Sequence, residues 1–243
     1  MGQNNDGRVL LVGDRTDLAD TVTAQLEAAG WPSIIASNGE EALHVASGGA
    51  PDVVVIVLPL HHENGAELCT TIRSESAVPI VCVTGRGSDQ GLVDTLEAGA
   101  DDYIAKPFSP RELVARIEAA IRRANIEPYR NETVPGRPYN GSHGVLQAGN
   151  VRLDLTTCRV SVNGKMKTLT PNEFRLMAVF MRAPGEVFTR EELRKRVWPD
   201  DQHSLHLVEV HIANLRAKIE VDPHHPVYVV TVRSRGYKFA VQN

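Results

Sequence analysis

Five short runs rich in β-branched residues alternate with amphipathic segments between residues 8 and 123. This alternation is typical of βα units, which build a parallel sheet covered by helices. One run, Val53–Leu58, is apolar throughout, so we expect it to form a central strand buried on both faces. The pattern predicts an α/β domain of the flavodoxin-like (βα)5 type. The expected strands are Val9–Val12, Ser33–Ala36, Val53–Leu58, Ile80–Thr84 and Tyr103–Ala105.

Residues 124–144 contain three prolines and three glycines and show no apolar periodicity, which predicts a linker. Beyond the linker, β-type runs flank an Asn163-Gly164 turn, and capping boxes at Thr170–Glu173 and Thr189–Glu192 open two helices. A third helix is expected over Leu205–Val221 and a hairpin over Val227–Val241. This order predicts a winged helix-turn-helix. The chain thus divides into residues 1–123, 124–144 and 145–243.

The overall charge of -4 hides an asymmetry between the two predicted domains. Residues 1–123 carry nine basic and 18 acidic side chains, whereas residues 151–243 carry 15 basic and 10 acidic ones. The second domain is therefore suited to a polyanion.

No segment is expected to cross a membrane, because the longest apolar run, Val53–Leu60, is far too short. The N-terminus is polar rather than signal-like, so we expect a cytoplasmic protein. Three cysteines, without paired metal spacing, indicate buried free thiols rather than a disulfide framework or a zinc site. They are Cys69, Cys82 and Cys158.

Motifs in both domains resemble those of the OmpR/PhoB response regulators, and the resemblance covers nearly the whole chain. In the first domain they are VLLVGD, PDVVVIVLPL followed by ENG, PIVCVTG and GADDYIAKPFSPREL. In the second they are LTPNEFRLMAVF, TREELRKRVW, LVEVHIANLRAKIE and TVRSRGYKF. The resemblance implies a phosphorylatable receiver domain followed by a DNA-binding effector domain.

The phosphorylation pocket implied by the resemblance is degenerate. Its positions here are Asp14, Val57, Thr84, Tyr103 and Lys106. Val57 occupies the phosphoacceptor position and has no nucleophilic atom, so aspartyl phosphorylation there is chemically impossible. Gly13-Asp14 replaces the family's acidic pair, and one carboxylate is a poor Mg²⁺ site.

Two interpretations of the retained pocket residues remain open. In the first, Thr84 caps a turn, Lys106 pairs with Asp14, and Tyr103 packs its ring. In the second, an apolar pocket flanked by His61 and His62 binds a small-molecule ligand in place of phosphate. A rival hypothesis, phosphorylation at another acceptor, would require Glu63 or Asp52.

The resemblance also implies a homodimer formed through charges on the fourth helix, fifth strand and fifth helix of the receiver. Solvated pairing within one chain is the alternative. The candidate residues are Glu97, Asp101, Asp102, Arg111, Arg116 and Arg122.

On the third helix of the second domain, Val208, Ile212, Leu215 and Ile219 form one apolar stripe that is expected to pack inward. The residues expected to face outward are His206, Leu207, Val210, His211, Asn214 and Lys218. Among them, Leu207, Val210 and Asn214 are the candidates for base contacts in the major groove.

By family position, further residues are expected to contact the DNA backbone or the minor groove. They are Trp198, His206, His211 and Arg216, with Thr231, Arg233 and Arg235 in the wing. Two positions that often carry arginine in the family hold His206 and Asn214, so site preference should differ. A metal site at His203, His206 and His211 is disfavoured, because the spacing misplaces the last two on a helix.

Together these observations predict a sequence-specific transcriptional regulator that acts independently of aspartyl phosphate, with neither enzymatic activity nor a cofactor. Its expected partners are double-stranded DNA, arranged as direct repeats, and RNA polymerase. The remaining alternative is a receiver that serves mainly as a protein-interaction module while the basic domain binds DNA weakly.

Overall fold

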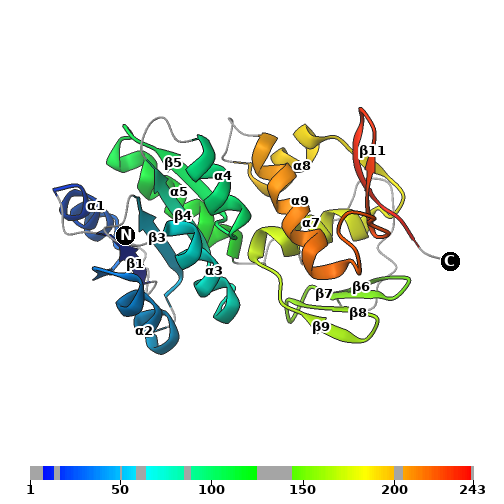
Figure 1. The fold of residues 1–243 in the computed structure, drawn as a ribbon, viewed down its shortest axis with the longest axis horizontal. Helices are drawn as coiled ribbons and strands as arrows, with labels where there is room; N and C mark the ends of the chain where they lie inside the picture. Colours follow the sequence, from blue (N-terminus) through cyan, green and yellow to red (C-terminus); the bar gives the residue numbers. More distant parts are fainter. Residues whose placement is uncertain are drawn as a thin grey trace. The chain divides into compact units, whose positions relative to one another are not determined.

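The computed structural model describes residues 8–13, 17–49, 51–58, 64–84, 89–124, 144–199 and 205–241. It divides into two compact units, Met1–Ala124 and Asn125–Asn243 (Figure 1). Most of the predicted linker, 124–144, falls outside the described residues. No helix in the described part of the chain is long and apolar enough to span a membrane.

The first unit contains a parallel five-stranded sheet in the order β2-β1-β3-β4-β5. Its central strand β3 is buried along its whole length, as its apolar sequence predicted. The flavodoxin-like fold class is therefore confirmed. The strands are β1 (Val9–Val12), β2 (Ser33–Ala36), β3 (Val53–Val57), β4 (Ile80–Thr84) and β5 (Asp102–Ala105).

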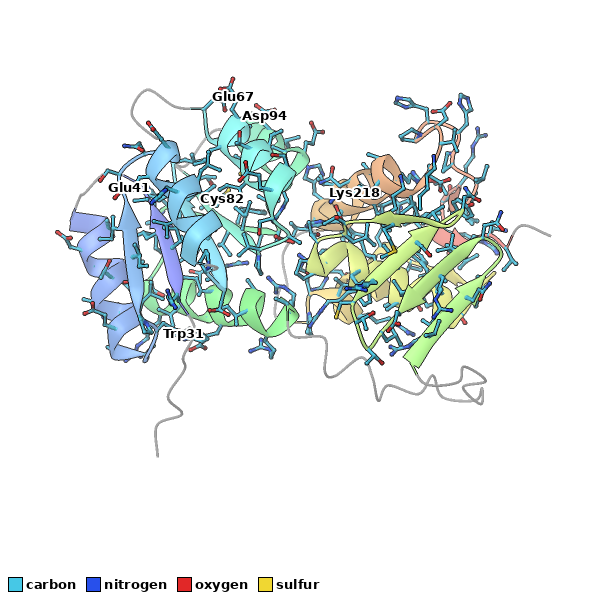
Figure 2. All side chains as sticks on the ribbon, turned by 90° about the horizontal axis from the view of Figure 1, so that it is seen from below. Trp31, Glu41, Glu67, Cys82, Asp94 and Lys218 are labelled. Carbon is cyan, nitrogen blue, oxygen red and sulfur yellow. The ribbon has the colours of Figure 1, made fainter. Side chains whose placement is uncertain are left out.

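Helices cover both faces of this sheet (Figure 1). On one face α1 packs against α5, and on the other α3 contacts both α2 and α4. Trp31, which follows α1, lies beside α5, and its Nε1 donates to Glu118 Oε1 at 3.3 Å (Figure 2). The helices are α1 (Asp17–Ala28), α2 (Gly39–Gly49), α3 (Gly65–Glu75), α4 (Asp89–Glu97) and α5 (Pro110–Ala124).

The second unit begins with an antiparallel sheet in the order β6-β7-β8-β9. The predicted Asn163-Gly164 turn joins β8 to β9, with both residues at positive φ, as a two-residue hairpin of the mirror-image type requires. Strand β6 was not foreseen. The strands are β6 (Val145–Ala148), β7 (Val151–Asp154), β8 (Arg159–Val162) and β9 (Lys165–Lys167).

Three helices and a three-stranded sheet complete the second unit and confirm the winged helix-turn-helix arrangement. Thr170 and Thr189 form the two predicted capping boxes. Strand β10 was missed because it has only two residues, yet it pairs with β12 to make the sheet β10-β12-β11. The elements are α7 (Pro171–Arg182), β10 (Val187–Phe188), α8 (Arg190–Val197), α9 (Leu205–Ile219), β11 (Val229–Val232) and β12 (Gly236–Phe239).

The cysteines correct one expectation. Cys69 on α3 and Cys82 on β4 are buried, and their sulfur atoms lie 3.9 Å apart. The hydrogen bond with Cys69, followed by burial, raises the pKa of the Cys82 thiol. Cys158 is exposed, because it lies in the surface turn between β7 and β8, where its φ is positive.

Candidate functional site

The degenerate receiver pocket lies at the carboxyl edge of the parallel sheet, where β1, β3 and β4 end. Val57 ends β3 with only 9% of its surface exposed, beside Gly13, which follows β1. A Cβ atom placed on Gly13 would lie 3.0 Å from the Cβ of Val57, closer than two carbon atoms ordinarily approach. A side chain at position 13 would therefore require the ends of β1 and β3 to shift slightly.

The side chain of Lys106, which follows β5, bonds to a backbone carbonyl at the end of β3. Its Nζ donates to the carbonyl oxygen of Leu58 at 3.0 Å. Thr84 is buried at the end of β4, and Tyr103 is half-buried on β5. Asp14, His61, His62 and Glu63 lie outside the described residues, so the predicted pairing of Lys106 with Asp14 stays a prediction.

Asp52 cannot serve as an alternative phosphoacceptor in this pocket. It precedes Val53, at the amino end of β3, where its carboxylate accepts a hydrogen bond from the Arg8 amide at 2.7 Å. The pocket lies at the other end of that five-residue strand, roughly 16 Å away.

Among the predicted dimer residues, Asp101 and Asp102 are buried, which corrects the expectation that their charges are offered at the surface. Asp101 accepts from the Ile80 amide at 2.9 Å and pairs with Arg73. Asp102 pairs with Arg123 at 2.7 Å and with Arg116 at 3.3 Å.

The alternative of pairing within one chain therefore describes Asp101, Asp102 and Arg116. Burying a carboxylate is costly unless it is paired, and both of these aspartates have arginine partners within the same chain. The other dimer candidates, Glu97, Arg111 and Arg122, are exposed.

Helix α9, the predicted recognition helix, is covered on two sides, because it packs against both α7 and α8. The predicted inward stripe of Val208, Ile212, Leu215 and Ile219 is buried. The prediction that Leu207, Val210 and His211 face outward is wrong, since all three are also buried. Trp198, expected to contact the DNA backbone, is fully buried as well and lies over the His211 ring, with centroids 5.1 Å apart.

The face of α9 that remains open to solvent is narrower than predicted and displaced around the helix. His206, Glu209, Ala213 and Arg216 recur at spacings of three and four residues, so they form one stripe. Asn214 is half-exposed beside it. Sequence reasoning missed Glu209 and Ala213; the signal available was that Leu207 and Val210, being apolar, are better suited to a core than to an open face.

Two cations on α9 that were predicted to bind DNA, Arg216 and Lys218, already bond to other groups of the same domain. Arg216 donates from Nε to the Val229 carbonyl and from an amino group to Thr231 Oγ1, each at 2.8 Å. Burial lowers the pKa of Arg216. Lys218 (Figure 2) lies 2.7 Å from the carboxylate of Glu173.

Arg216 thus connects α9 to the wing, and Lys218 connects it to α7. Arg233 and Arg235 differ from them, because both are exposed in the turn between β11 and β12. The tip of the wing therefore carries two exposed cations.

The fold and these sites define a class of two-domain regulators in which a receiver precedes a winged-helix output domain. Residues 9–118 match the family model of the response regulator receiver domain, and residues 164–239 match that of the C-terminal domain of transcriptional regulatory proteins.

Full-length relatives extend both matches. The DNA-binding response regulator MtrA of Mycolicibacterium paratuberculosis is 39% identical over 235 residues, covering 95% of this chain and 97% of the relative. The sensory transduction protein RegX3 of Mycobacterium bovis is 40% identical over 231 residues, with coverage of 95% and 97%. The chain belongs to the OmpR/PhoB family of DNA-binding response regulators.

A solved structure shares the whole architecture. A cysteine-to-serine mutant of RitR aligns with a TM-score of 0.76 and 25% identity, covering 97% of this chain and 100% of the mutant. Its similarity extends across both units of the chain.

Proposed function

We propose that this response regulator binds specific DNA sequences without phosphorylation of its receiver domain. The observation that carries the proposal is Val57 at the end of β3, packed against Gly13. Valine offers no oxygen to attack a phosphoryl donor. We propose that residues 1–123 form the receiver, 124–144 the linker and 145–243 the DNA-binding domain.

The pocket does not fit the Mg²⁺ ion that phosphoryl transfer in this family requires. Magnesium prefers near-octahedral oxygen coordination supplied partly by carboxylates. Gly13 and Val57 supply no carboxylate, so Asp14 is the one acidic side chain left at the family's pocket positions. The Lys106 ammonium has the Leu58 carbonyl as a partner, so its position does not depend on a bound phosphate.

We propose that the open face of α9 contacts the bases of DNA and that the wing contacts the phosphates or the minor groove. The α9 candidates are His206, Glu209, Ala213 and Asn214. The wing candidates are Arg233 and Arg235, whose exposure supports the assignment. Arg216, bonded to Thr231, positions the wing against α9.

We further propose a homodimer formed through the receiver, which binds direct repeats and engages RNA polymerase. Glu97 on α4 and the arginines Arg111 and Arg122 on α5 are exposed and of opposite sign, which supports an exchange of charges across a two-fold axis. In this arrangement the dimer equilibrium depends on the sequence or on another ligand rather than on phosphate.

The experiment that tests the proposal measures phosphorylation and DNA binding on the same protein. The full chain is incubated with radiolabelled acetyl phosphate and Mg²⁺, next to a response regulator that carries aspartate at the position of Val57. We expect label only on the comparison protein, and unchanged affinity of this chain for its preferred duplex at fixed salt. Stable, magnesium-dependent label on this chain would contradict the proposal.

Two variants sharpen this experiment. Val57→Asp alone restores an acceptor and, together with Asp14, gives the pocket a second carboxylate, so magnesium-dependent label on this variant and none on the unmodified chain would assign the loss of phosphorylation to Val57. The double variant Gly13→Asp/Val57→Asp restores the family pattern and serves as the internal control for a functional phosphoacceptor.

A further inference from the structure

Arg190, the first residue of α8, makes an ion pair with the exposed face of α9. Its Nε lies 2.6 Å from Glu209 Oε1. The two side chains are 38% and 45% exposed, so the pair lies at the surface. The hydrogen bond to Glu209 is the main cause that raises the pKa of Arg190.

The same guanidinium is fixed by an aromatic ring of the wing. It lies over the Tyr237 ring at 5.4 Å from the centroid, and the guanidinium of Arg216 lies over that ring at 5.6 Å. Such contacts are favourable because the ring face is electron-rich. Arg190 therefore joins α8, α9 and β12, which restricts where it can place the Glu209 carboxylate.

Glu209 is an acidic group on a face assigned to a polyanion, and this needs a physical explanation. An unpaired carboxylate near phosphates would weaken binding to every duplex, whatever its sequence. Pairing with Arg190 neutralises that charge and occupies Oε1, while the ion partner of Oε2 among the described residues is His206 Nδ1, at 3.9 Å, beyond hydrogen-bond distance. One oxygen is thus left to accept a hydrogen bond.

We propose that Arg190 is a positioning residue for base recognition, which holds Glu209 so that its second oxygen accepts from the amino group of a cytosine in the major groove. The inference rests on the proposed function, because it presumes that the open face of α9 enters that groove. Cytosine presents a donor at this edge, adenine presents its donor beside the N7 acceptor, and thymine and guanine present acceptors that would repel the carboxylate. Ala213, one turn along α9, presents only a methyl group beside Glu209 and leaves room for a base edge.

The geometry requires arginine and not simply a positive charge. Arginine is planar and has several donors, so it bonds Glu209 while its Cζ lies 5.4 Å from the centre of the Tyr237 ring. A lysine ammonium is a compact charge that cannot do both. Arg190→Lys should therefore retain binding strength better than it retains base preference.

The test measures base preference at each position by selecting bound duplexes from a randomised library with the full chain. Glu209→Ala identifies the base pair that Glu209 recognises. Arg190→Ala and Arg190→Lys are expected to reduce discrimination at that same base pair by roughly tenfold, and to leave preferences elsewhere unchanged. In Arg190→Ala/Glu209→Ala the second substitution should add little, since both remove one interaction.

Arg196→Ala is the matched control. Arg196 is another exposed arginine of α8, but it lies over the Phe188 ring, 5.1 Å from its centroid, and the control variant should keep the full base preference. If Arg190→Ala instead weakened binding to all duplexes equally and left the base preference intact, Arg190 would be a phosphate contact and the inference would be overturned. Absence of any preference in the unmodified chain would instead overturn the proposed function itself, which keeps the two failures distinct.

Discussion

Glu220 is expected to be one of the most important single side chains for the stability of the second unit. It follows α9, is 7% exposed, and accepts three backbone hydrogen bonds. The donors are the amides of Val227, Tyr228 and Val229, each at 2.9 Å. The carboxylate thereby fastens the chain entering β11 to the end of the recognition helix.

The magnitude follows from what Glu220→Ala would leave behind. Tyr228 and Val229 are buried, so their amides would lose a charged acceptor without gaining water. Each stranded buried donor costs about 1–3 kcal/mol, and the more accessible Val227 amide adds less. We expect a total loss of about 3–5 kcal/mol, a large part of the roughly 5–15 kcal/mol that stabilises a domain.

The chain offers an optical probe specific to this unit. Its two tryptophans, Trp31 and Trp198, lie in different units and both are buried. In a Trp31→Phe background, fluorescence of Trp198 during urea unfolding reports the second unit alone.

Two further variants bracket the result. Glu186→Ala, an exposed glutamate, should change the unfolding free energy by less than about 0.5 kcal/mol. The loss of stability for Glu220→Gln should lie between those of the other two variants. The amide oxygen of glutamine can still accept from Tyr228 and Val229, whereas its amino group is a donor that would face the donor of Val227. A loss below about 1 kcal/mol for Glu220→Ala would refute the reasoning.

Two other predictions concern charges elsewhere in the chain. Arg73→Met should destabilise the first unit by about 3–5 kcal/mol, because it removes the cation that pairs with the buried Asp101 carboxylate. Trp31 fluorescence during urea unfolding, in a Trp198→Phe background, measures this loss. Arg111→Met, at an exposed arginine, is the control and should have little effect. Hydrogen bonds from the backbone amides of Thr157 and, to a lesser extent, Thr156 lower the pKa of the Asp154 carboxyl. The ionised carboxylate therefore stabilises the fold above about pH 4, and this stabilisation is lost as the pH falls through the lower pKa of the folded state. The unfolding free energies of the unmodified chain and of Asp154→Asn should therefore converge towards low pH, and a constant difference between pH 5 and 3 would contradict that linkage.

The sheet of the receiver was predictable because β1 to β4 are short runs rich in β-branched residues and bounded by turn signals. Its central strand, Val53–Val57, is the clearest case. Strand β10 was not predictable in this way, since a two-residue strand has no period and forms only because β12 passes beside it.

The open face of α9 was misplaced for a different reason. A helical wheel selects one apolar stripe, but α7 and α8 together cover a wider arc of this helix. His211 looks like a surface residue in sequence, yet Trp198 covers its ring. Likewise, no pattern of charges could reveal that Asp102 is already paired with Arg123 in the same chain.

Gly13 and Val57, the two departures from the family pattern, differ in what reversing each would restore. Aspartate at position 57 alone would create an acceptor and, together with Asp14, give the pocket two carboxylates, a number that Mg²⁺ sites use. A side chain at position 13 alone would restore no acceptor and would bring its Cβ within 3.0 Å of the Cβ at position 57, at a cost typical of overpacking, about 1–3 kcal/mol. Position 57 is therefore the departure that removes phosphorylation, and reversing it is the single substitution expected to restore an acceptor.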